Sequence, residues 1–347
     1  MIAFIEKKQN QHDVGISWRR GISKEKDVKK IVLGCLLVGL FSVHADAGFD
    51  HRDDVSQWLD EAGGLGFTKT EVAQYLAQTT AKPSIVPVLR NAPERKLLWS
   101  GYQQRLVTSS RIKRGRGFVK KHAAQLHLVA QETGVDAAIV AAIAGIESNY
   151  GANMGKHLTL RVLATLSFDY PRRSEFYQRQ LAEFFRLCYS QGLDPTLVKG
   201  SAAGAVGMGQ FIPTSYRDFA VDGDGDARID LFHSEADNIA SIANYLARHG
   251  WEAGAPWLLE VDTQVEPVWL SKKVKRQGVA LAKWQGRGIV VPTSVDSTAE
   301  FNLYAFSTEG QSEYRLAGAN FYAITRYNHS LWYSRAVVEI AQGIAKP

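Results

Sequence analysis

Cysteine, charge bias and metal-binding histidine pairs are scarce in this chain of 347 residues. The two cysteines, Cys35 and Cys188, are too few for a disulfide framework, a zinc ribbon or an iron–sulfur site. None of the nine histidines belongs to a His-Glu-x-x-His pair, so metalloprotease chemistry is not expected. Residues 1–47 hold eight of the 41 Lys and Arg and five of the 35 Asp and Glu, which leaves a net charge of +3 for residues 48–347. So small an excess predicts no nucleic-acid partner.

An apolar run near the N-terminus, Ile31 to Val43, is too short to cross a membrane comfortably. It follows Lys29 and Lys30 and is followed by Ala45-Asp46-Ala47. A basic stretch, a short apolar region and an Ala-x-Ala exit are typical of a secretory signal. We therefore expect residues 1–47 to direct export to the periplasm and to be removed, leaving no transmembrane helix in the mature chain.

The same run contains Val32-Leu33-Gly34-Cys35, which resembles a lipobox. A lipid on Cys35 would make the protein a membrane-anchored lipoprotein. Only four apolar residues precede Cys35 after the lysines, and the apolar run continues beyond it. A soluble exported protein is therefore favoured, with the lipoprotein as the alternative.

Beyond this region the residue spacing predicts a mainly α fold with a small β content (α+β). Thr68–Glu71 is a capping box that opens a helix reaching about Gln78. Helical spacing continues over residues 122–250 and returns from Tyr322 to the end. Residues 262–315 instead alternate β-branched residues with polar residues and turn formers, which predicts short strands. The expected strand residues are Val265, Val268, Val274, Val279, Ile289, Val290 and Val291.

The first candidate for chemistry is Glu147, which follows an almost wholly apolar segment, residues 137–146. Asp136 can cap this segment as a helix, and Gly151 is placed to end it. Glu147 follows Ile143 by four residues, so it emerges on an apolar face in the last turn. Burial and the negative end of the helix dipole both disfavour a charged carboxylate there, as suits an acid that protonates a leaving oxygen. The alternative is a helix-end Glu that simply reaches solvent.

The second candidate is the glycine-rich segment from Gly204 to Tyr216. Its glycines let the backbone approach a ligand closely, and Gln210 offers both a donor and an acceptor. No Gly-Lys-Ser/Thr follows, so the segment is not a phosphate loop. The alternative is a tight turn between two helices.

Five motifs follow one another along the chain. They are Glu147-Ser148-x-Tyr150-Gly151, Ala164-Thr165-Leu166-Ser167-Phe168-x-Tyr170-Pro171-Arg172-Arg173, Gly207-Met208-Gly209-Gln210-Phe211-x-Pro213-x-Ser215-Tyr216, Ala243-Asn244-Tyr245-x-x-x-x-Gly250-Trp251 and Ile324-Thr325-Arg326-Tyr327-Asn328-x-Ser330. In this order and at these spacings they resemble the MltB family of lytic transglycosylases. The resemblance runs from about Phe67 to the C-terminus.

The resemblance implies a lysozyme-like helical catalytic core, an N-terminal helical region and a small β-rich segment. The expected division is 48–118 for the N-terminal helices, 119–260 with 319–347 for the core, and 261–318 for the β-rich segment. The implied reaction cleaves the β-1,4 bond between N-acetylmuramic acid and N-acetylglucosamine in the glycan strands of peptidoglycan. A monomer is expected, with other cell-wall enzymes as candidate partners.

In this reading Glu147 protonates the glycosidic oxygen and then activates the O6 hydroxyl of muramic acid, which attacks its own anomeric carbon. Ordinary glycosidases need a second carboxylate, but here the nucleophile is already tethered to the substrate. The nearest downstream acid, Asp169, lies on a segment better suited to holding substrate. A calcium-stabilised peptidoglycan-binding protein without turnover and a hydrolytic muramidase are the alternatives.

The resemblance also assigns ten residues to substrate binding. Phe211, Tyr327 and Tyr333 would form walls that face the sugars. The others are Tyr102 and Tyr245 in the groove, Ser201 and Gln210 as polar contacts, Asn328 beside the acid, and Arg172 and Arg173 for carboxylates of the peptide stem. Core packing is the alternative for each aromatic residue. Phe176 stands where the family has Tyr, and Arg161 stands where it has Asp.

The third candidate is the acidic loop of residues 222–237. Asp222, Asp224 and Asp226 at loop positions 1, 3 and 5, with the backbone carbonyl of Arg228 at position 7, follow the order of EF-hand ligands. Three carboxylates so close together repel one another unless a cation neutralises them. We therefore expect a structural Ca²⁺ ion, the alternative being an Asp-rich surface turn.

The loop departs from the EF-hand pattern in two places. Ala227 takes the position that is usually Gly, and His233 takes the position of the usual bidentate Glu. The family resemblance implies a longer loop that a later carboxylate closes. Asp237 fits that role, with Glu235 as the second choice.

Overall fold

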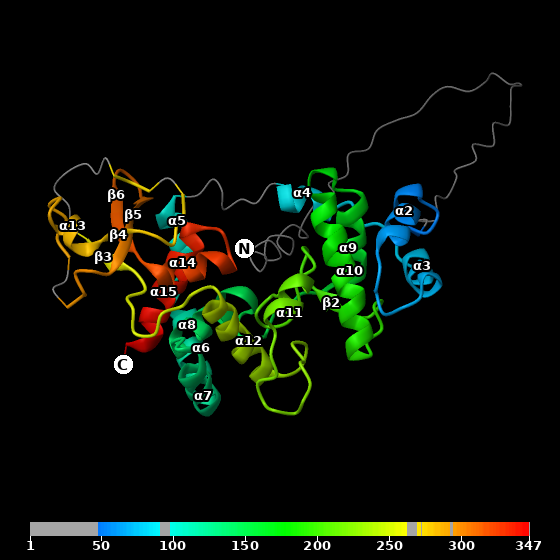
Figure 1. Cartoon of the computed structure of the whole chain (residues 1–347), viewed down its shortest axis with the longest axis horizontal. Helices are drawn as coiled ribbons and strands as arrows, with labels where there is room; N and C mark the ends of the chain where they lie inside the picture. The colour runs from blue at the N-terminus through cyan, green and yellow to red at the C-terminus, as the bar shows by residue number, and fades with distance from the viewer. Residues whose placement is uncertain (1–47, 91–97, 262–268, 272, 292–293, 347) are drawn as a thin grey trace, which may run out of the picture.

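The computed structural model describes residues 48–90, 98–261, 269–271, 273–291 and 294–346 (Figure 1). Within these ranges most residues that belong to regular elements are helical, and the strands are few and mostly short. The prediction of a mainly α fold with a small β content is therefore confirmed. The expected signal region, residues 1–47, and Cys35 lie outside the described residues.

The chain begins with helices that precede the central helix. These are α2 (Asp53–Glu61), α3 (Lys69–Ala77), α4 (Ile85–Arg90), α5 (Trp99–Leu106), α6 (Ser109–Lys121) and α7 (Ala123–Thr133). The predicted capping box is present at the start of α3, because the Thr68 side chain accepts from the Glu71 N–H and the Glu71 carboxylate accepts from the Thr68 N–H. Phe67, just before α3, packs edge-on against Phe185 of a later helix, at a centroid distance of 6.2 Å.

The central helix is α8 (Ala137–Ser148), whose residues from Ile139 onward are all buried. A helix that is apolar on every side lies inside a protein rather than on its surface. The helices that contact it most are α6, α12 (Glu235–Arg248) and α15 (Leu331–Ala345). Because α8 is enclosed in this way, the side chains of its last turn lie in the interior of the molecule.

A second group of helices stands beside the central one (Figure 1). In it α9 (Thr159–Phe168) packs against α10 (Ser174–Gln191), with the 3₁₀ turn η3 (Pro171–Arg173) between them and α11 (Pro213–Phe219) against α10. A two-stranded antiparallel ladder, β1 (His157–Leu158) with β2 (Lys199–Gly200), connects these elements. The last helix before α15 is α14 (Ala319–Tyr327).

The β-rich segment forms a four-stranded antiparallel sheet in the order β3-β6-β5-β4. Its strands are β3 (Leu259–Glu260), β4 (Val279–Ala280), β5 (Glu300–Ser307) and β6 (Ser312–Ala317), with α13 (Leu281–Gln285) after β4. Alternate residues of β5 face opposite sides. Phe301 and Leu303 belong to a small apolar cluster with α13, whereas Tyr304 and Phe306 belong to the main core. The sheet thus joins the helical core through one face.

The strand prediction was correct for the segment but not for the residues that carry it. The longest strands are β5 and β6, whereas Val279 lies in a strand of two residues and Ile289 to Val291 lie outside the extended ladder. Val265 and Val268 lie outside the described residues. Strand pairing is a long-range property, so the richest β-branched stretch did not identify the paired residues.

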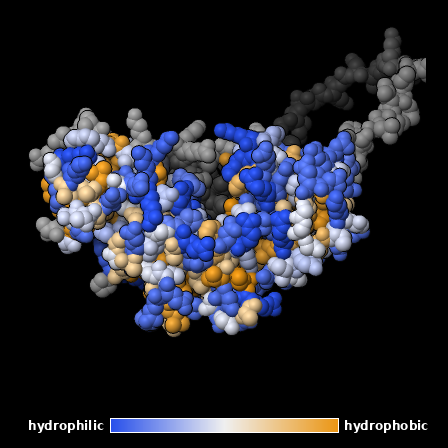
Figure 2. Space-filling model, viewed as in Figure 1, coloured by the Kyte–Doolittle hydropathy of each residue, from blue (hydrophilic) through white to orange (hydrophobic). Residues whose placement is uncertain are grey.

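Hydrophilic residues cover much of the face seen in Figure 2, with apolar residues in scattered patches. Within the described part of the chain, no one helix has both the length and the apolar character needed to cross a membrane. The helices α7 and α8 have that length and apolar character only when they are taken together, and a bend of 113° separates them.

Candidate active site

Glu147 lies in the last turn of α8 and is only 5% exposed. Tyr333 on α15 and Tyr327 at the end of α14 face the same interior region. Burial first, and then the negative charge of Glu147, raises the pKa of both phenols well above 10.0. Two distant parts of the sequence, α8 and the region of α14 and α15, therefore bring one carboxyl group and two hydroxyl groups together. The alternative of a Glu that reaches solvent is not what the structure shows.

The start of α8 differs from the prediction in one respect. Asp136 occupies the N-cap position, but its side chain makes no capping hydrogen bond. Its carboxylate instead accepts from the indole N–H of Trp257 at 2.8 Å. The tertiary partner therefore replaces the local cap that the sequence suggests.

The end of α8 is fixed by two non-glycine residues in the left-handed conformation. Asn149 (φ 57°) ends the helix in place of the expected Gly151, and Tyr150 (φ 60°) follows. This conformation costs a non-glycine residue about 1–2 kcal/mol. The Tyr150 hydroxyl donates to the carbonyl of Arg111 at 2.8 Å, and a Cβ atom on Gly145 would lie 2.5 Å from its oxygen. Packing thus holds a strained turn directly after Glu147.

Three aromatic side chains from different elements form one cluster beside this region. The ring centroids of Phe211 and Tyr327 lie 5.9 Å apart, and those of Tyr245 and Tyr327 lie 4.8 Å apart. The Tyr245 hydroxyl donates to the carbonyl of Arg326 at 2.6 Å, and burial raises the pKa of Tyr245 to about 12. These contacts bring two of the predicted wall residues, Phe211 and Tyr327, together with the predicted groove residue Tyr245.

Tyr102 and Trp332 form a ring contact near Tyr333. Tyr102, on α5, is buried with its ring centroid 5.8 Å from that of Trp332. Its charge is among the causes that raise the pKa of Tyr333, after burial and Glu147. The structure therefore places Tyr102 near the same interior region as Glu147.

The glycine-rich segment is a tight loop that reverses on itself. Val206 and Phe211 exchange two backbone hydrogen bonds, at 2.8 and 2.9 Å, across the turn. Gly207 has φ 74°, and a Cβ atom there would lie 2.6 Å from the carbonyl oxygen of Leu231, so a side chain does not fit. The Gln210 amide donates to the carbonyls of Met154 (3.1 Å) and Gly207 (3.0 Å). A loop of this shape fits both alternatives, a tight turn between two helices and a backbone that approaches a ligand closely.

Sequence reasoning missed Asn238, a buried residue on α12 that holds this loop. Its side-chain oxygen accepts from the backbone N–H groups of Met208 (2.8 Å) and Gly209 (3.3 Å). Its amide donates to the carbonyls of Leu231 (2.9 Å) and Ser234 (2.8 Å). An Asn after an acidic loop gives no local sign of such a role, because its partners in the glycine-rich loop lie 30 and 29 residues away.

The other predicted binding residues are less closely grouped. Ser201 is buried and its hydroxyl oxygen accepts from the N–H groups of Ala203 and Ala205 at 3.3 and 3.1 Å. Asn328 is half-buried and ends α14. Arg172 and Arg173 are exposed on η3, where the Arg173 guanidinium lies 4.2 Å from the ring centroid of Phe176. Phe176, which stands where the family resemblance expects a Tyr, thus holds Arg173 against the face of its ring.

Asp169 and Arg161 both contact distant parts of the chain. Asp169 is paired with Arg52, with Nη1 and Oδ1 2.6 Å apart. Arg161 donates to the carbonyls of Thr80 (2.9 Å) and Ala81 (3.0 Å), so it fastens the segment after α3 to α9. Both side chains have structural partners.

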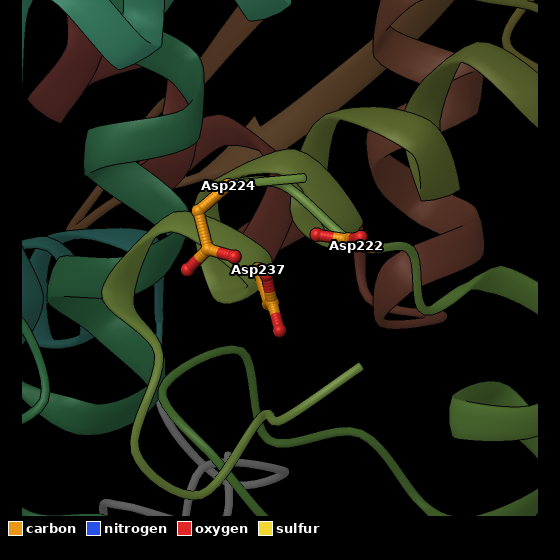
Figure 3. A group of neighbouring side chains, drawn as sticks. All are labelled: Asp222, Asp224 and Asp237. Carbon is orange, nitrogen blue, oxygen red and sulfur yellow. The ribbon is translucent and has the colours of Figure 1, made fainter. Parts of the chain in front are cut away.

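The acidic loop brings Asp222, Asp224 and Asp237 together (Figure 3). One carboxylate oxygen of each lies within 4.8 Å of the others. Oxygens on opposite sides of a calcium ion, at about 2.3–2.6 Å from it, would be about 4.6–5.2 Å apart. The donor atoms are all oxygen, which is the ligand type that calcium takes. The spacing and chemistry of the three residues therefore fit a Ca²⁺ ion.

Asp237, and not Glu235, closes the acidic group. Glu235 turns away to Lys121, with Nζ 2.6 Å from its carboxylate. Asp226 also lies outside the group of three, and its carboxylate accepts from the N–H of Arg228 at 2.8 Å. Ala227 has φ 68°, which explains why glycine is usual at this position.

Taken together, the helical fold and the buried carboxyl group beside an aromatic cluster define a lysozyme-like enzyme. A family model described as "Transglycosylase SLT domain" matches residues 50–342, and the chain belongs to this family. It is 31% identical over 307 residues to membrane-bound lytic murein transglycosylase B of Escherichia coli (strain K12), covering 86% of this chain and 84% of the relative.

Two solved structures show the same fold. Catenated lytic transglycosylase SltB1 from Pseudomonas aeruginosa has a TM-score of 0.79 at 33% identity, covering 86% of this chain and 98% of that chain. Lytic transglycosylase Slt35 of E. coli, solved in complex with calcium, has a TM-score of 0.77 at 31% identity, covering 88% of this chain and 97% of that chain. The expected lysozyme-like fold and family are therefore confirmed.

Proposed function

We propose that the protein is a peptidoglycan lytic transglycosylase in which Glu147 is the single catalytic acid and base. Its family, and the names of relatives that cover most of the chain, support this class of enzyme. The observation that carries the role of Glu147 is its burial at the end of α8 beside Tyr327 and Tyr333. A protein that only bound glycan would have no need of a buried acid there.

The reaction has two proton transfers at the same carboxyl group. Glu147 donates its proton to the glycosidic oxygen as the bond from that oxygen to C1 of N-acetylmuramic acid breaks. The carboxylate then takes the proton of the O6 hydroxyl as O6 bonds to C1 of the same sugar, giving the 1,6-anhydro end. Glu147 regains from O6 the proton that it gave to the glycosidic oxygen, so one carboxyl group completes the cycle without water.

Water must be kept from C1 for this outcome. The buried surroundings of Glu147 favour an attack by the tethered O6, whose effective concentration is far above that of an untethered nucleophile. Asp169, the nearest downstream acid, is engaged with Arg52 and is not assigned a role in the chemistry. A hydrolytic muramidase is for this reason the less favoured reading.

The ten predicted binding residues are proposed to line the glycan groove. The ring contacts among Phe211, Tyr245 and Tyr327 support an aromatic wall, and the buried Tyr102 and Tyr333 are proposed to close its inner end. Gln210, Ser201 and Asn328 supply polar groups. The exposed Arg172 and Arg173 are proposed to meet carboxylates of a peptide stem.

We also propose that the acidic loop binds a structural Ca²⁺ ion through Asp222, Asp224 and Asp237. Asp226 and the carbonyl of Arg228 are the further ligands that the loop order suggests. A relative, Slt35, was solved in complex with calcium, which supports the choice of metal. Nothing in the chemistry at Glu147 uses the ion.

Export to the periplasm through residues 1–47 stays a proposal. The name of the E. coli relative, a membrane-bound enzyme, supports the lipoprotein alternative through Cys35. The glycan strands of peptidoglycan are the proposed partner, as the word murein in that name indicates. A monomeric state and association with other cell-wall enzymes are likewise proposals.

The decisive experiment is mass spectrometry of the soluble products after residues 48–347 have acted on purified sacculi. Muropeptides that end in 1,6-anhydro-muramic acid are expected. Glu147→Gln should lower the rate by about 10²- to 10⁴-fold and leave binding to sacculi intact. Glu183→Gln is the matched control, because Glu183 is also buried but is paired with Arg186 and Arg217.

The other outcomes distinguish the alternatives. Products with free reducing ends would identify a hydrolytic muramidase. A second carboxylate would then have to be sought. Binding without any product would identify a binding protein. A Glu147→Gln variant with the wild-type rate would remove Glu147 from the chemistry, whichever products appear.

A further inference from the structure

We propose that Asn238 is a positioning residue that couples the acidic loop to the loop of residues 206–211 and so to the site around Glu147. The inference rests on the proposed catalytic function for its effect on turnover and on the proposed calcium site for its dependence on calcium. Asn238 directly follows Asp237 on α12, and the two side chains serve different loops. One end of a single helix therefore contacts both the candidate calcium site and the glycine-rich turn.

On the first side, Asp237 is locked into the acidic loop. One of its carboxylate oxygens accepts from the N–H of Gly223 at 2.8 Å and the other from the N–H of Asp230 at 2.6 Å. Its own backbone N–H donates to the Ser234 hydroxyl at 3.1 Å. Asp237 is 1% exposed, so a change in the arrangement of the acidic loop acts on the first turn of α12.

On the second side, Asn238 uses all of its hydrogen-bonding capacity. The oxygen accepts from the N–H groups of Met208 and Gly209, and the amide donates to two carbonyls of the segment that leads into α12. The side chain is 3% exposed, so water cannot easily replace these partners. The backbone of the turn is thereby held at one distance from α12.

The glycine-rich turn then reaches the candidate active site. The carbonyl of Gly209 accepts from the Tyr327 hydroxyl at 2.6 Å, and Phe211 packs on the Tyr327 ring at 5.9 Å. Tyr327 is one of the two phenols whose pKa is raised first by burial and then by the charge of Glu147. The path from Asp237 to Tyr327 thus consists of one covalent step and two sets of hydrogen bonds.

A cation at Asp222, Asp224 and Asp237 bears directly on this path. A bound ion would hold the three carboxylates together and fix the first turn of α12. Without an ion, the mutual repulsion of the carboxylates would loosen the loop and with it Asp237 and Asn238. Protection of the Met208 and Gly209 amides should therefore depend on calcium, although neither residue belongs to the acidic loop.

Hydrogen exchange of the backbone amides of Met208 and Gly209, with and without added CaCl₂, tests the coupling directly. In the wild-type protein both amides should exchange at least about tenfold more slowly with calcium. In Asn238→Ala both should exchange about tenfold faster than in the wild type, and calcium should no longer change their rate. The affinity for calcium, measured by calorimetry, should change by less than about threefold. Asn238→Asp keeps the accepting oxygen but sets a second carboxylate oxygen against the carbonyls of Leu231 and Ser234, so its protection should fall below that of the wild type.

The matched control is Asn244→Ala on the same helix. The Asn244 amide donates to the carbonyl of Phe219 at 2.8 Å and has no bond to the glycine-rich turn. This variant should leave exchange at Met208 and Gly209 unchanged. On sacculi, Asn238→Ala should lose about tenfold in kcat with little change in KM, because it displaces the site without removing a sugar contact.

Two results would overturn the coupling alone. One is exchange at Met208 and Gly209 in the wild-type protein that does not respond to calcium although calorimetry shows that calcium binds, which can be measured even if Asn238→Ala does not fold. The other is exchange in Asn238→Ala that matches the wild type. A wild-type protein that binds no calcium in calorimetry would overturn the proposed calcium site and the coupling together. A wild-type protein without turnover would overturn the proposed function alone, because the exchange experiment does not depend on it.

Discussion

Replacing Tyr333 by Phe separates the catalytic use of a buried hydroxyl from its contribution to stability. Tyr333 is fully buried on α15. Within the part of the chain that the structure describes, its hydroxyl has no well-formed hydrogen bond. Yet it faces Glu147, which together with burial raises its pKa. A hydroxyl that is buried without a well-formed bond costs stability, and is kept where it serves function.

The expected magnitudes follow from these contacts. Burying a hydroxyl with poor compensation costs about 1–3 kcal/mol, and Phe fills the same space without that cost. Tyr333→Phe should therefore leave the free energy of unfolding unchanged or raise it by about 1 kcal/mol. We expect the hydroxyl to form a hydrogen bond to Glu147 only when that group becomes a carboxylate during the reaction. A hydrogen bond to a charged group contributes about 1.5–3 kcal/mol, so loss of this donor should lower kcat about 10- to 100-fold.

Two assays are needed on the same protein. Denaturant unfolding gives the change in stability, and release of 1,6-anhydro muropeptides from sacculi gives kcat. Tyr304→Phe on β5 is the matched control, because Tyr304 is also buried but its hydroxyl bonds to the carbonyl of Lys273 at 3.3 Å. That variant should lose up to about 1 kcal/mol and keep its kcat. The reasoning is refuted if Tyr333→Phe loses more than about 2 kcal/mol while kcat stays at the wild-type value.

Three other predictions follow from single contacts. Ala227→Gly relieves a left-handed φ of 68° but adds freedom to the unfolded chain, so stability with calcium should rise by about 0.5 kcal/mol; a lower Tm in calorimetry would contradict this. Asp169→Asn removes the ion pair with Arg52, so it should cost about 0.5–1 kcal/mol in denaturant unfolding and leave the anhydro products unchanged; loss of those products would make Asp169 a second catalytic acid. Burial first, and then the Lys82 ammonium at 2.7 Å, lowers the pKa of His157 from 6.5. The unfolded chain then binds the proton more readily than the folded one, so this contribution to stability is present above pH 6.5 and is lost as the pH falls from 6.5 toward the lower folded pKa. Denaturant unfolding between pH 7.5 and about 5 should show a shallower loss for His157→Gln than for the wild type, and equal slopes would contradict the assignment.

Some of the site could be predicted because local chemistry decides it. The segment before Glu147 is apolar on every side, and such a helix has to be buried wherever the rest of the chain goes. The capping box at Thr68 and Glu71 joins residues three apart, so the start of α3 could be predicted from adjacent residues. The order of aspartates in residues 222–226 indicated a cation loop for the same reason.

Other parts could not be predicted because their partners are distant in sequence. Asp136 looked like a local cap, yet Trp257 takes its carboxylate. The strands that pair, β5 and β6, are those whose two faces meet two different apolar clusters, and a β-branched run alone does not reveal this. Asn238 holds Met208 and Gly209 through contacts that no spacing rule suggests.

The sequence by itself determined a buried helix that ends in Glu147, an acidic loop with the ligand order of a calcium site, and five ordered motifs that indicated the family. Only the tertiary structure decided that Asp237 closes the acidic group, that Tyr327 and Tyr333 face Glu147, and that Asn238 links the two loops. The physical reason is one of range. Burial and capping depend on residues within a few positions of one another, whereas the partners of a buried polar group are chosen when distant helices pack together.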